Sequence, residues 1–252
     1  MTQAHIAALR ASVTRLRDIA ATLSNAELTG GAYPEQWSIA QALSHLGSGA
    51  VIMQRRLEDT LTGRPTPDDF APEVWDTWNA KSPTAQRDDA FAADAALLAR
   101  IERTTPEQRS GFAMSMGPMQ LTFTDFVAMR LNEHAFHTWD VEVVGNPGAT
   151  LPGQIASLVV DNLGLVARCT AKPTGDTAGI TVTTVNPQRG FTIDLTADDV
   201  TIDTGPAAAE ADLTIPAETF ARLVYGRLDA AHTPAGLPAA SLETLRLVFP
   251  GP

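Results

Sequence analysis

The sequence predicts two parts of different fold class, a helical bundle over residues 1–148 and a small α+β domain over residues 149–252. In the first part, apolar residues recur every three to four positions in long stretches, which is typical of amphipathic helices. In the second part, short stretches that alternate apolar and polar residues favour strands. Between them, residues 145–148 read Gly-Asn-Pro-Gly, a cluster that interrupts regular structure and marks the expected boundary.

Four long helices are expected in the first part. The second begins at a capping box, in which the Ser38 hydroxyl accepts from the third helical amide and the Gln41 side chain reaches back to the cap. A loop at 25–36 precedes this helix. The methionine-rich segment Gly111–Met119 fits neither periodicity, so we expect another loop there. The expected helices span about residues 3–24, 38–61, 84–104 and 124–144.

The second part is expected to begin with one helix and then to turn into a sheet. Apolar spacing predicts that helix from Pro152 to about Cys169. Asn-Pro, Asp-Asp and Gly-Pro pairs separate the alternating stretches that follow, as turns separate strands. The expected strands are residues 180–185, 191–195, 200–203 and 211–215, and the expected closing helices are residues 216–225 and 242–249.

Composition excludes several classes of partner. The formal net charge of −11 argues against a nucleic-acid or anionic-membrane partner, because binding phosphates needs a concentrated basic surface. No apolar run approaches the roughly eighteen residues of a membrane span. The single cysteine, Cys169, cannot form an internal disulfide, and the first residues lack a signal-peptide pattern. We therefore expect a cytoplasmic protein.

Glu133 and His137 are four residues apart on the fourth expected helix and share one of its faces. At about 100° per residue they differ by about 40° around the helix, whereas His134 is turned about 60° from His137 in the other direction. A metal ion held by this pair needs a third ligand, and His45, at the flank of the second helix's apolar stripe, is the best placed. Arg130 lies near the same stripe, so an Arg130–Glu133 ion pair is the alternative. Spacing alone leaves both readings open.

Three segments occur together in the first part: Trp37–Leu46, Gly117–Met119 and Arg130–Asp140. Over about residues 5–145 this arrangement resembles the mycothiol-dependent maleylpyruvate isomerase family, part of the DinB-like superfamily of metal-binding four-helix bundles. The resemblance implies a zinc site formed by His45, Glu133 and His137. The segment Ala211–Arg227 resembles the small C-terminal domain of this family, which implies a sterol-carrier-like α+β fold for the second part.

The implied ligand set determines the expected chemistry. Two imidazoles and one carboxylate leave zinc, or another divalent metal, with an open position, as in catalytic sites. The resemblance implies mycothiol as the thiol cofactor or co-substrate, and a coordinated thiol loses its proton. Attack on an electrophilic small molecule would make the protein an S-transferase or a maleylpyruvate-type cis–trans isomerase. Arg222 and Arg227, on the helix after the last strand, are the candidates for binding a substrate anion, and Asp140 is a candidate for orienting a ligand.

Two hypotheses of other classes remain. The chain could be a non-catalytic module that binds a metal or an apolar ligand, with the second domain acting like a lipid carrier. It could also be an interaction scaffold without a metal, in which Arg130 pairs with Glu133. In the enzyme hypothesis the partners are a small-molecule thiol and its electrophilic substrate, and a homodimer is left open.

Overall fold

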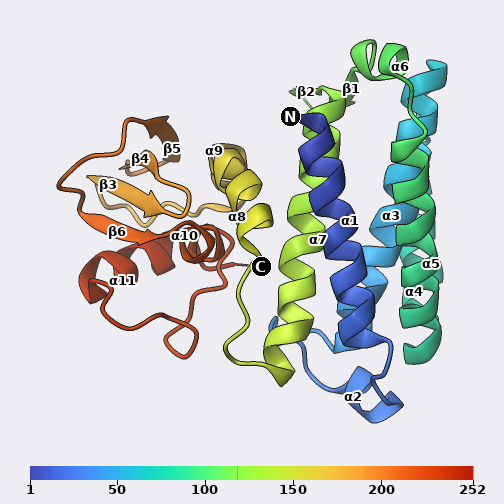
Figure 1. The fold of residues 1–252 in the computed structure, drawn as a ribbon, viewed down its shortest axis with the longest axis horizontal. Coiled ribbons are helices and arrows are strands. Elements are labelled where there is room, and N and C mark those ends of the chain that lie inside the picture. The colour runs from blue at the N-terminus through green and yellow to red at the C-terminus, as the bar shows by residue number, and fades with distance from the viewer. Residues whose placement is uncertain (118, 252) are drawn as a thin grey trace. The chain divides into compact units, whose positions relative to one another are not determined.

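The structure is a computed structural model of the 252-residue chain, and it describes residues 1–117 and 119–251, with only the backbone at Cys169 and Ala240. The chain divides into two compact units, Met1–Ala149 and Thr150–Pro252 (Figure 1). Of the three segments that carry the family resemblance, one includes Pro118, which lies outside the described residues. Within the described part of the chain, no helix is both long and apolar enough to cross a membrane.

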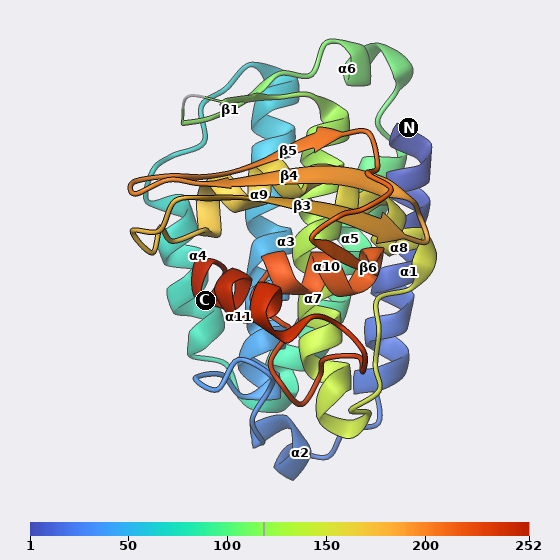
Figure 2. The same ribbon diagram turned by 90° about the vertical axis from the view of Figure 1, so that its left-hand side faces the viewer.

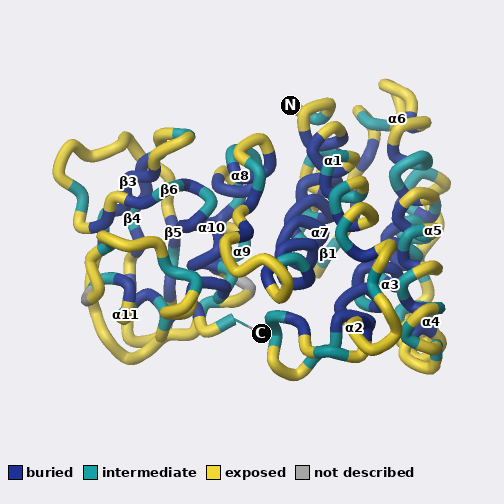
Figure 3. The backbone as a smooth tube through the Cα atoms, turned by 60° about the horizontal axis from the view of Figure 1, so that its bottom comes forward, coloured by how far each residue is buried: buried dark blue, intermediate teal, exposed yellow. Residues whose placement is uncertain are grey.

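The first unit is a bundle of four long helices, as predicted, with shorter elements in the segments that connect them (Figure 1). Helix α3 packs against α5 and α7, and α1 packs against α5 and α7. Figure 3 shows that buried stretches alternate with exposed ones along these helices, which is the burial pattern of amphipathic helices. The long helices are α1 (Thr2–Ala20), α3 (Ile39–Thr62), α5 (Pro83–Glu102) and α7 (Phe123–Gly145), and the shorter ones are α2 (Asn25–Thr29), α4 (Phe70–Asn79) and α6 (Pro106–Ser110).

Hydrogen-bonded caps determine where the two site-bearing helices begin. The backbone N–H of Gln41 donates to the Ser38 hydroxyl at 3.1 Å, and the Ser38 N–H donates to the Gln41 side chain at 2.8 Å, which confirms the predicted capping box of α3. Helix α7 has the same arrangement between Thr122 and Asp125, so it begins slightly earlier than predicted. The expectation of a loop throughout 25–36 was wrong, because Ser24 caps the short helix α2.

The methionine-rich segment is a β-hairpin and not the expected loop. Strands β1 (Met114–Met116) and β2 (Met119–Leu121) pair in antiparallel register, with Met116 opposite Met119. Gly117 adopts a φ of +57°, a backbone conformation that glycine adopts without steric cost. With three residues in each strand, the alternation is too short to be recognised as a strand pattern from sequence.

Gly47 allows α3, α4 and α5 to approach closely. A Cβ atom built on Gly47 would lie 2.2 Å from the Trp78 ring and 2.8 Å from the Cα of Ala90. Trp78 and Ala90 are both buried in the hydrophobic core cluster that also contains Leu43 and Leu46. Glycine at this position therefore sets the distance of α4 and α5 from the helix that carries His45.

The second unit begins with a broken helix where a single one was expected. Helix α8 (Gly153–Val159) passes through a 3-10 turn, η1 (Val160–Asn162), into α9 (Leu163–Thr170). Asn162 leaves the helical region, with φ of −109° and ψ of 5°. A Cβ on Gly164 would lie 2.7 Å from the carbonyl oxygen of Ile202. The break thus lets α9 approach strand β5 (Val200–Gly205), a tertiary contact that local periodicity does not reveal.

The sheet of the second unit has the strand order β5-β4-β3-β6 (Figure 2). All neighbours are antiparallel except β3 and β6, which run parallel. The apolar residues that face the helices include Phe191, whose ring centroid lies 5.1 Å from that of Phe220 on α10. The strands are β3 (Ala178–Val185), β4 (Arg189–Leu195), β5 (Val200–Gly205) and β6 (Leu213–Pro216), and the helices that follow are α10 (Ala217–Val224) and α11 (Ala239–Val248). The predicted α+β class of this part is confirmed.

Candidate metal centre

His45, Glu133 and His137 come together in the first unit, although His45 lies on α3 and the other two on α7. One potential ligand atom from each residue lies within 4.8 Å of the other two. The Nε2 atom of His45 is 3.2 Å from the Oε2 atom of Glu133, and the Nε2 atom of His137 is 3.7 Å from the same oxygen. Two imidazole nitrogens and a carboxylate oxygen at this spacing can hold one divalent metal ion.

Asp140 fixes the ring of His137. Its carboxylate is fully buried and lies 2.8 Å from the Nδ1 atom of His137. Since a carboxylate only accepts, Nδ1–H is the donor, and in the neutral ring Nε2, on the side of Glu133, carries the lone pair. A carboxylate behind an imidazole is the usual arrangement around metal-binding histidines, because it fixes the ring orientation and raises the basicity of the ligand nitrogen.

Trp37 packs against both histidines, a role that the sequence analysis did not assign. Its ring centroid lies 5.0 Å from that of His45 and 5.4 Å from that of His137. The preceding loop is held by hydrogen bonds, including one from the Ala32 N–H to the Trp37 carbonyl at 2.8 Å. The Tyr33 N–H donates to the Asp140 carbonyl at 3.1 Å, so the loop is also tied to α7. The position of Trp37 directly before the capping box of α3 was the available sequence signal.

Electrostatics favour an ionised Glu133. Partial removal of its side chain from water would raise the pKa of Glu133, but a hydrogen bond from His45 and the charges of His137, His45 and Arg130 lower this pKa to about 2. Its side chain is 46% exposed, and that of His45 is 39% exposed, whereas that of His137 is 8% exposed. The carboxylate is therefore in the form that binds a cation and is accessible to a ligand.

The alternative Arg130–Glu133 ion pair is wrong as a description of this helix face. Arg130 is buried and its guanidinium pairs with Asp94 of α5 instead. His134 is also buried, and its Nε2 atom lies 3.2 Å from the other Asp94 oxygen, on the side of the helix turned away from His137 in the sequence analysis. Arg130 affects Glu133 only through its charge.

Arg222 and Arg227 are both buried in the second unit. The Nε and Nη2 atoms of Arg222 donate to Glu218 at 2.9 and 3.2 Å, and Nη1 donates to two backbone carbonyls. The Nη1 atom of Arg227 donates to the Tyr225 carbonyl at 2.7 Å. These bonds give both side chains structural contacts, and the predicted role in binding a substrate anion stays a prediction.

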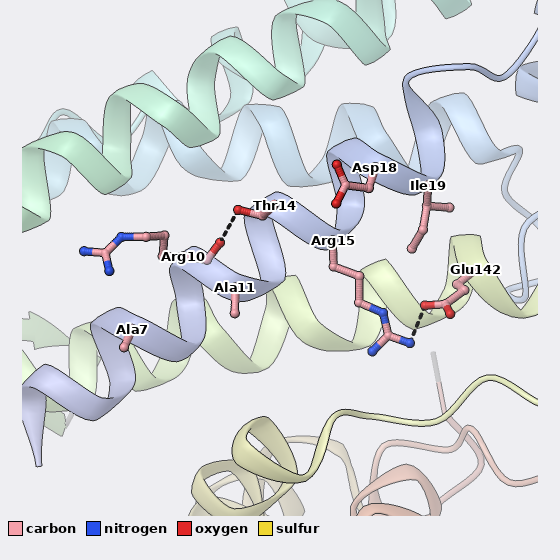
Figure 4. Close-up of a pocket in the computed structure, with 8 residues that line it drawn as sticks. All are labelled: Ala7, Arg10, Ala11, Thr14, Arg15, Asp18, Ile19 and Glu142. Atoms are coloured by element: carbon pink, nitrogen blue, oxygen red, sulfur yellow. Dashed lines mark hydrogen bonds and ion pairs between the residues drawn. The ribbon is translucent and has the colours of Figure 1, made fainter.

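Two cavities of the first unit lie apart from the three ligand residues. One, of about 600 Å³, is lined by Met114 and Met116 of the hairpin together with Arg56 and Arg64. The other is a shallow depression along α1 (Figure 4), where Arg15 pairs with Glu142 at 2.6 Å. Among the residues that the structure describes, His45, Glu133 and His137 form the group of three or more potential ligands that meets in one place.

Comparison with known proteins identifies the first unit. The model of the mycothiol maleylpyruvate isomerase N-terminal domain matches residues 9–142, which is more than half of the chain. The chain belongs to this family. The family model covers all three candidate ligands together with Trp37 and Asp140. No match was found among curated proteins.

The fold of the whole chain is that of a maleylpyruvate isomerase. A crystal structure of the mycothiol-dependent maleylpyruvate isomerase matches with a TM-score of 0.66 and 15% sequence identity, covering 94% of this chain and 96% of that one. A crystal structure of a mutant of that enzyme matches with the same TM-score and coverage at 14% identity. Because the match covers 94% of this chain, the second unit lies within the fold that the two proteins share.

Proposed function

We propose that this protein is a metal-dependent enzyme that uses a low-molecular-weight thiol, mycothiol, as its cofactor or co-substrate. The observation that carries the proposal is the convergence of His45, Glu133 and His137, with Asp140 behind His137. Family membership and the fold shared with a mycothiol-dependent enzyme support the choice of thiol. The metal we propose is zinc, because two imidazoles and one carboxylate are a common ligand set of catalytic zinc sites.

Each residue of the site has a defined task in this proposal. His45 and His137 supply neutral nitrogen ligands, and Glu133 supplies a negative charge that offsets part of the charge of a divalent ion. Asp140 holds the His137 ring so that Nε2 faces Glu133. Trp37 packs against both rings and restricts their orientation. When bound, zinc supplies the positive charge that lowers the pKa of a coordinated thiol.

The reaction we propose is addition of the thiol to an electrophilic carbon of a small molecule. Release of the conjugate would make the protein an S-transferase. Rotation about the former double bond, followed by expulsion of the thiol, would make it a cis–trans isomerase. Arg222 and Arg227 remain the candidates for pairing with a substrate carboxylate, as guanidinium groups do.

Metal analysis of the purified protein tests the first part of the proposal. After purification without chelator we expect about one zinc ion per chain, because the donor set forms one site. His45→Ala and His137→Ala should lose most of the bound metal, because each removes one of three ligands. His5→Ala is the matched control, since His5 is also a buried histidine on a bundle helix. Among the residues that the structure describes, its ring lies within hydrogen-bond distance of the Met1 carbonyl and not of a ligand residue.

A thiol assay tests the second part. With mycothiol supplied, we expect either consumption of the thiol or isomerisation of a conjugated cis substrate, and neither in His45→Ala. Metal-free wild-type protein would contradict the proposal. Full metal occupancy without any thiol-dependent turnover across a panel of electrophiles would favour the non-catalytic binding module instead.

A further inference from the structure

A buried polar cluster lies in the core of the first unit and takes no part in the proposed chemistry. It consists of Ser12, Asp94, Arg130, His134 and Thr138, each at most 3% exposed. We call it the core polar cluster. Ser12 belongs to α1, Asp94 to α5 and the other three to α7. Arg130 also bonds to the backbone of α3, so the cluster connects all four long helices at one level of the bundle.

Asp94 is the centre of the cluster. One carboxylate oxygen accepts from the Nη2 atom of Arg130, and the other lies 3.2 Å from the Nε2 atom of His134. Because the carboxylate only accepts, Nε2–H of His134 is the donor. The Nδ1 atom of His134 lies 2.8 Å from the Ser12 hydroxyl and 3.2 Å from the Thr138 hydroxyl. Each Asp94 oxygen therefore has a donor from α7.

Arg130 joins this cluster to both ligand-bearing helices. Its Nη2 atom donates to the carbonyl oxygen of Leu46 at 2.9 Å, and Leu46 directly follows His45. On α7, Arg130 lies three residues before Glu133, and His134 directly follows Glu133. Asp94 thus binds one residue a turn before Glu133 and one directly after it, and through Arg130 it connects them to the helix turn that carries His45.

Stability alone does not account for such a cluster. Taking an ion pair out of water has a large desolvation cost, and replacing a buried pair with apolar side chains of similar size is often neutral or stabilising. Burial would raise the pKa of Asp94, but the neighbouring His134 and Arg130 outweigh it and lower this pKa, so the carboxylate is charged. Hydrogen bonds depend on the orientation of the groups that form them, whereas apolar contacts do not. The bonds of this cluster therefore fix how α7 is rotated and translated against α3.

We propose that Asp94 is a positioning residue for the metal centre, acting through Arg130 and His134 to hold Glu133 in register with His45. This inference rests on the metal site of the proposed function. It predicts that the cluster contributes to metal affinity without touching the metal. The distance between His45 on α3 and Glu133 on α7 is the quantity that it controls.

The test measures metal affinity in variants that remove the cluster but keep the bundle folded. In the double variant Arg130→Met with Asp94→Leu, both charges leave together, so no unpaired charge stays buried. We expect this variant to stay folded with a lower unfolding temperature, because the buried His134 N–H and the Leu46 carbonyl lose these partners. Below that temperature, its zinc dissociation constant, measured by competition with a chromophoric chelator, should rise about 3- to 30-fold. The visible absorption spectrum of bound Co²⁺ should also change, because it depends on ligand geometry.

Single variants separate positioning from folding. Asp94→Asn keeps the size of the side chain but weakens both bonds, and we expect it to weaken zinc binding in the same direction. Arg100→Gln is the matched control, since it breaks the Arg100–Glu58 pair, which also joins α5 to α3. Glu58 lies thirteen residues after His45 on α3, so this pair does not involve a neighbour of a ligand residue. The control variant should lower stability and leave the zinc dissociation constant and the Co²⁺ spectrum unchanged.

The outcomes are distinguishable from failure of the proposed function. If wild-type protein binds zinc and His45→Ala does not, the metal site exists. Unchanged zinc affinity and an unchanged Co²⁺ spectrum in the double variant would then overturn the positioning role alone. Wild-type protein that binds no zinc would overturn the metal site itself, and the positioning role with it.

Discussion

The hydrogen bond between Asp140 and His137 connects a buried carboxylate directly to a proposed metal ligand. Asp140 lies three residues after His137, so one turn of α7 supplies both the ligand and the group that orients it. The geometry agrees with the orienting role predicted for Asp140. Since the carboxylate is fully buried, the bond does not compete with water.

We expect Asp140→Asn to weaken zinc binding by about 10- to 100-fold, as is usual when a partner behind a metal-binding histidine is changed. An amide can donate as well as accept, so it no longer enforces the Nδ1–H form of His137. Competition with a chelator measures the effect. Asp59→Asn is the matched control, since Asp59 is a buried acid that pairs with Arg55 away from the ligands. Equal zinc affinity in the two variants would contradict the prediction.

Asp94 also makes the stability of the first unit depend on pH. Its pKa in the folded protein is lower than its ordinary value of about 3.9. The ionised form therefore stabilises the fold above that ordinary value, and the contribution is lost as the pH falls through the lower, folded-state pKa. In the presence of chelator, the free energy of unfolding of the wild type should decrease as the pH falls below about 4.

Asp94→Asn should show a smaller decrease over the same pH range, because it has no proton to take up at this position. Urea unfolding followed by tryptophan fluorescence is the measurement. All four tryptophans, Trp37, Trp75, Trp78 and Trp139, belong to the first unit, so the signal reports on the bundle. Glu133 contributes pH dependence of the same sign in both proteins, so only the difference between them is assigned to Asp94. Identical pH profiles would contradict the prediction.

At the scale of single elements, the sequence predicted the long helices well and the tertiary contacts poorly. Apolar periodicity and the Ser38 cap were enough to locate α3, because both signals are local. Helix α7 could be placed, but its buried polar residues could not be paired, since Asp94 is 36 residues from Arg130 in the chain. Spacing placed Glu133 and His137 on one face, whereas the choice of His45 as partner needed the family resemblance.

The close packing around Gly47 predicts that an alanine there lowers the stability of the bundle. In an exposed helix, Gly→Ala stabilises, because alanine has the higher helix propensity. At Gly47 the added methyl group would overlap the Trp78 ring and approach the Ala90 backbone, so we expect Gly47→Ala to destabilise the bundle by about 1–3 kcal/mol. Gly145→Ala is the control, since a Cβ there meets nothing within 4 Å and should be neutral or slightly stabilising. Thermal unfolding that ranks the two variants in the opposite order would contradict this.

At the scale of the whole molecule, the fold class was predictable because the two parts differ in hydrophobic period. The last residue of the first unit is Ala149, next to the Gly-Asn-Pro-Gly cluster at which the sequence changes character. The indole N–H of Trp139 donates to the Ala149 carbonyl at 2.8 Å, so the end of α7 holds the chain that leaves the bundle. What the sequence could not show is the break between α8 and α9, which depends on contact with β5.

The second unit gives a prediction for Arg222. Its side chain is 3% exposed and pairs with Glu218, so Arg222→Ala would leave a partly buried carboxylate without this partner. We expect the second unit to lose about 3–5 kcal/mol of stability. Hydrogen exchange of α10, compared with that of α7, measures where the loss falls. Unchanged exchange with a raised KM for an anionic substrate would instead support the predicted role of Arg222 in substrate binding.

The stacking of Trp37 on the two histidines has an optical consequence. A fluorescent ring whose centroid lies 5.0 Å from that of His45 and 5.4 Å from that of His137 is within quenching range of any paramagnetic ion that they hold. Titration with Co²⁺ should therefore quench the tryptophan fluorescence of the protein, and the Trp37→Phe variant should lose most of that quenching. The molecule carries its own indicator of site occupancy, which needs neither a label nor knowledge of the substrate.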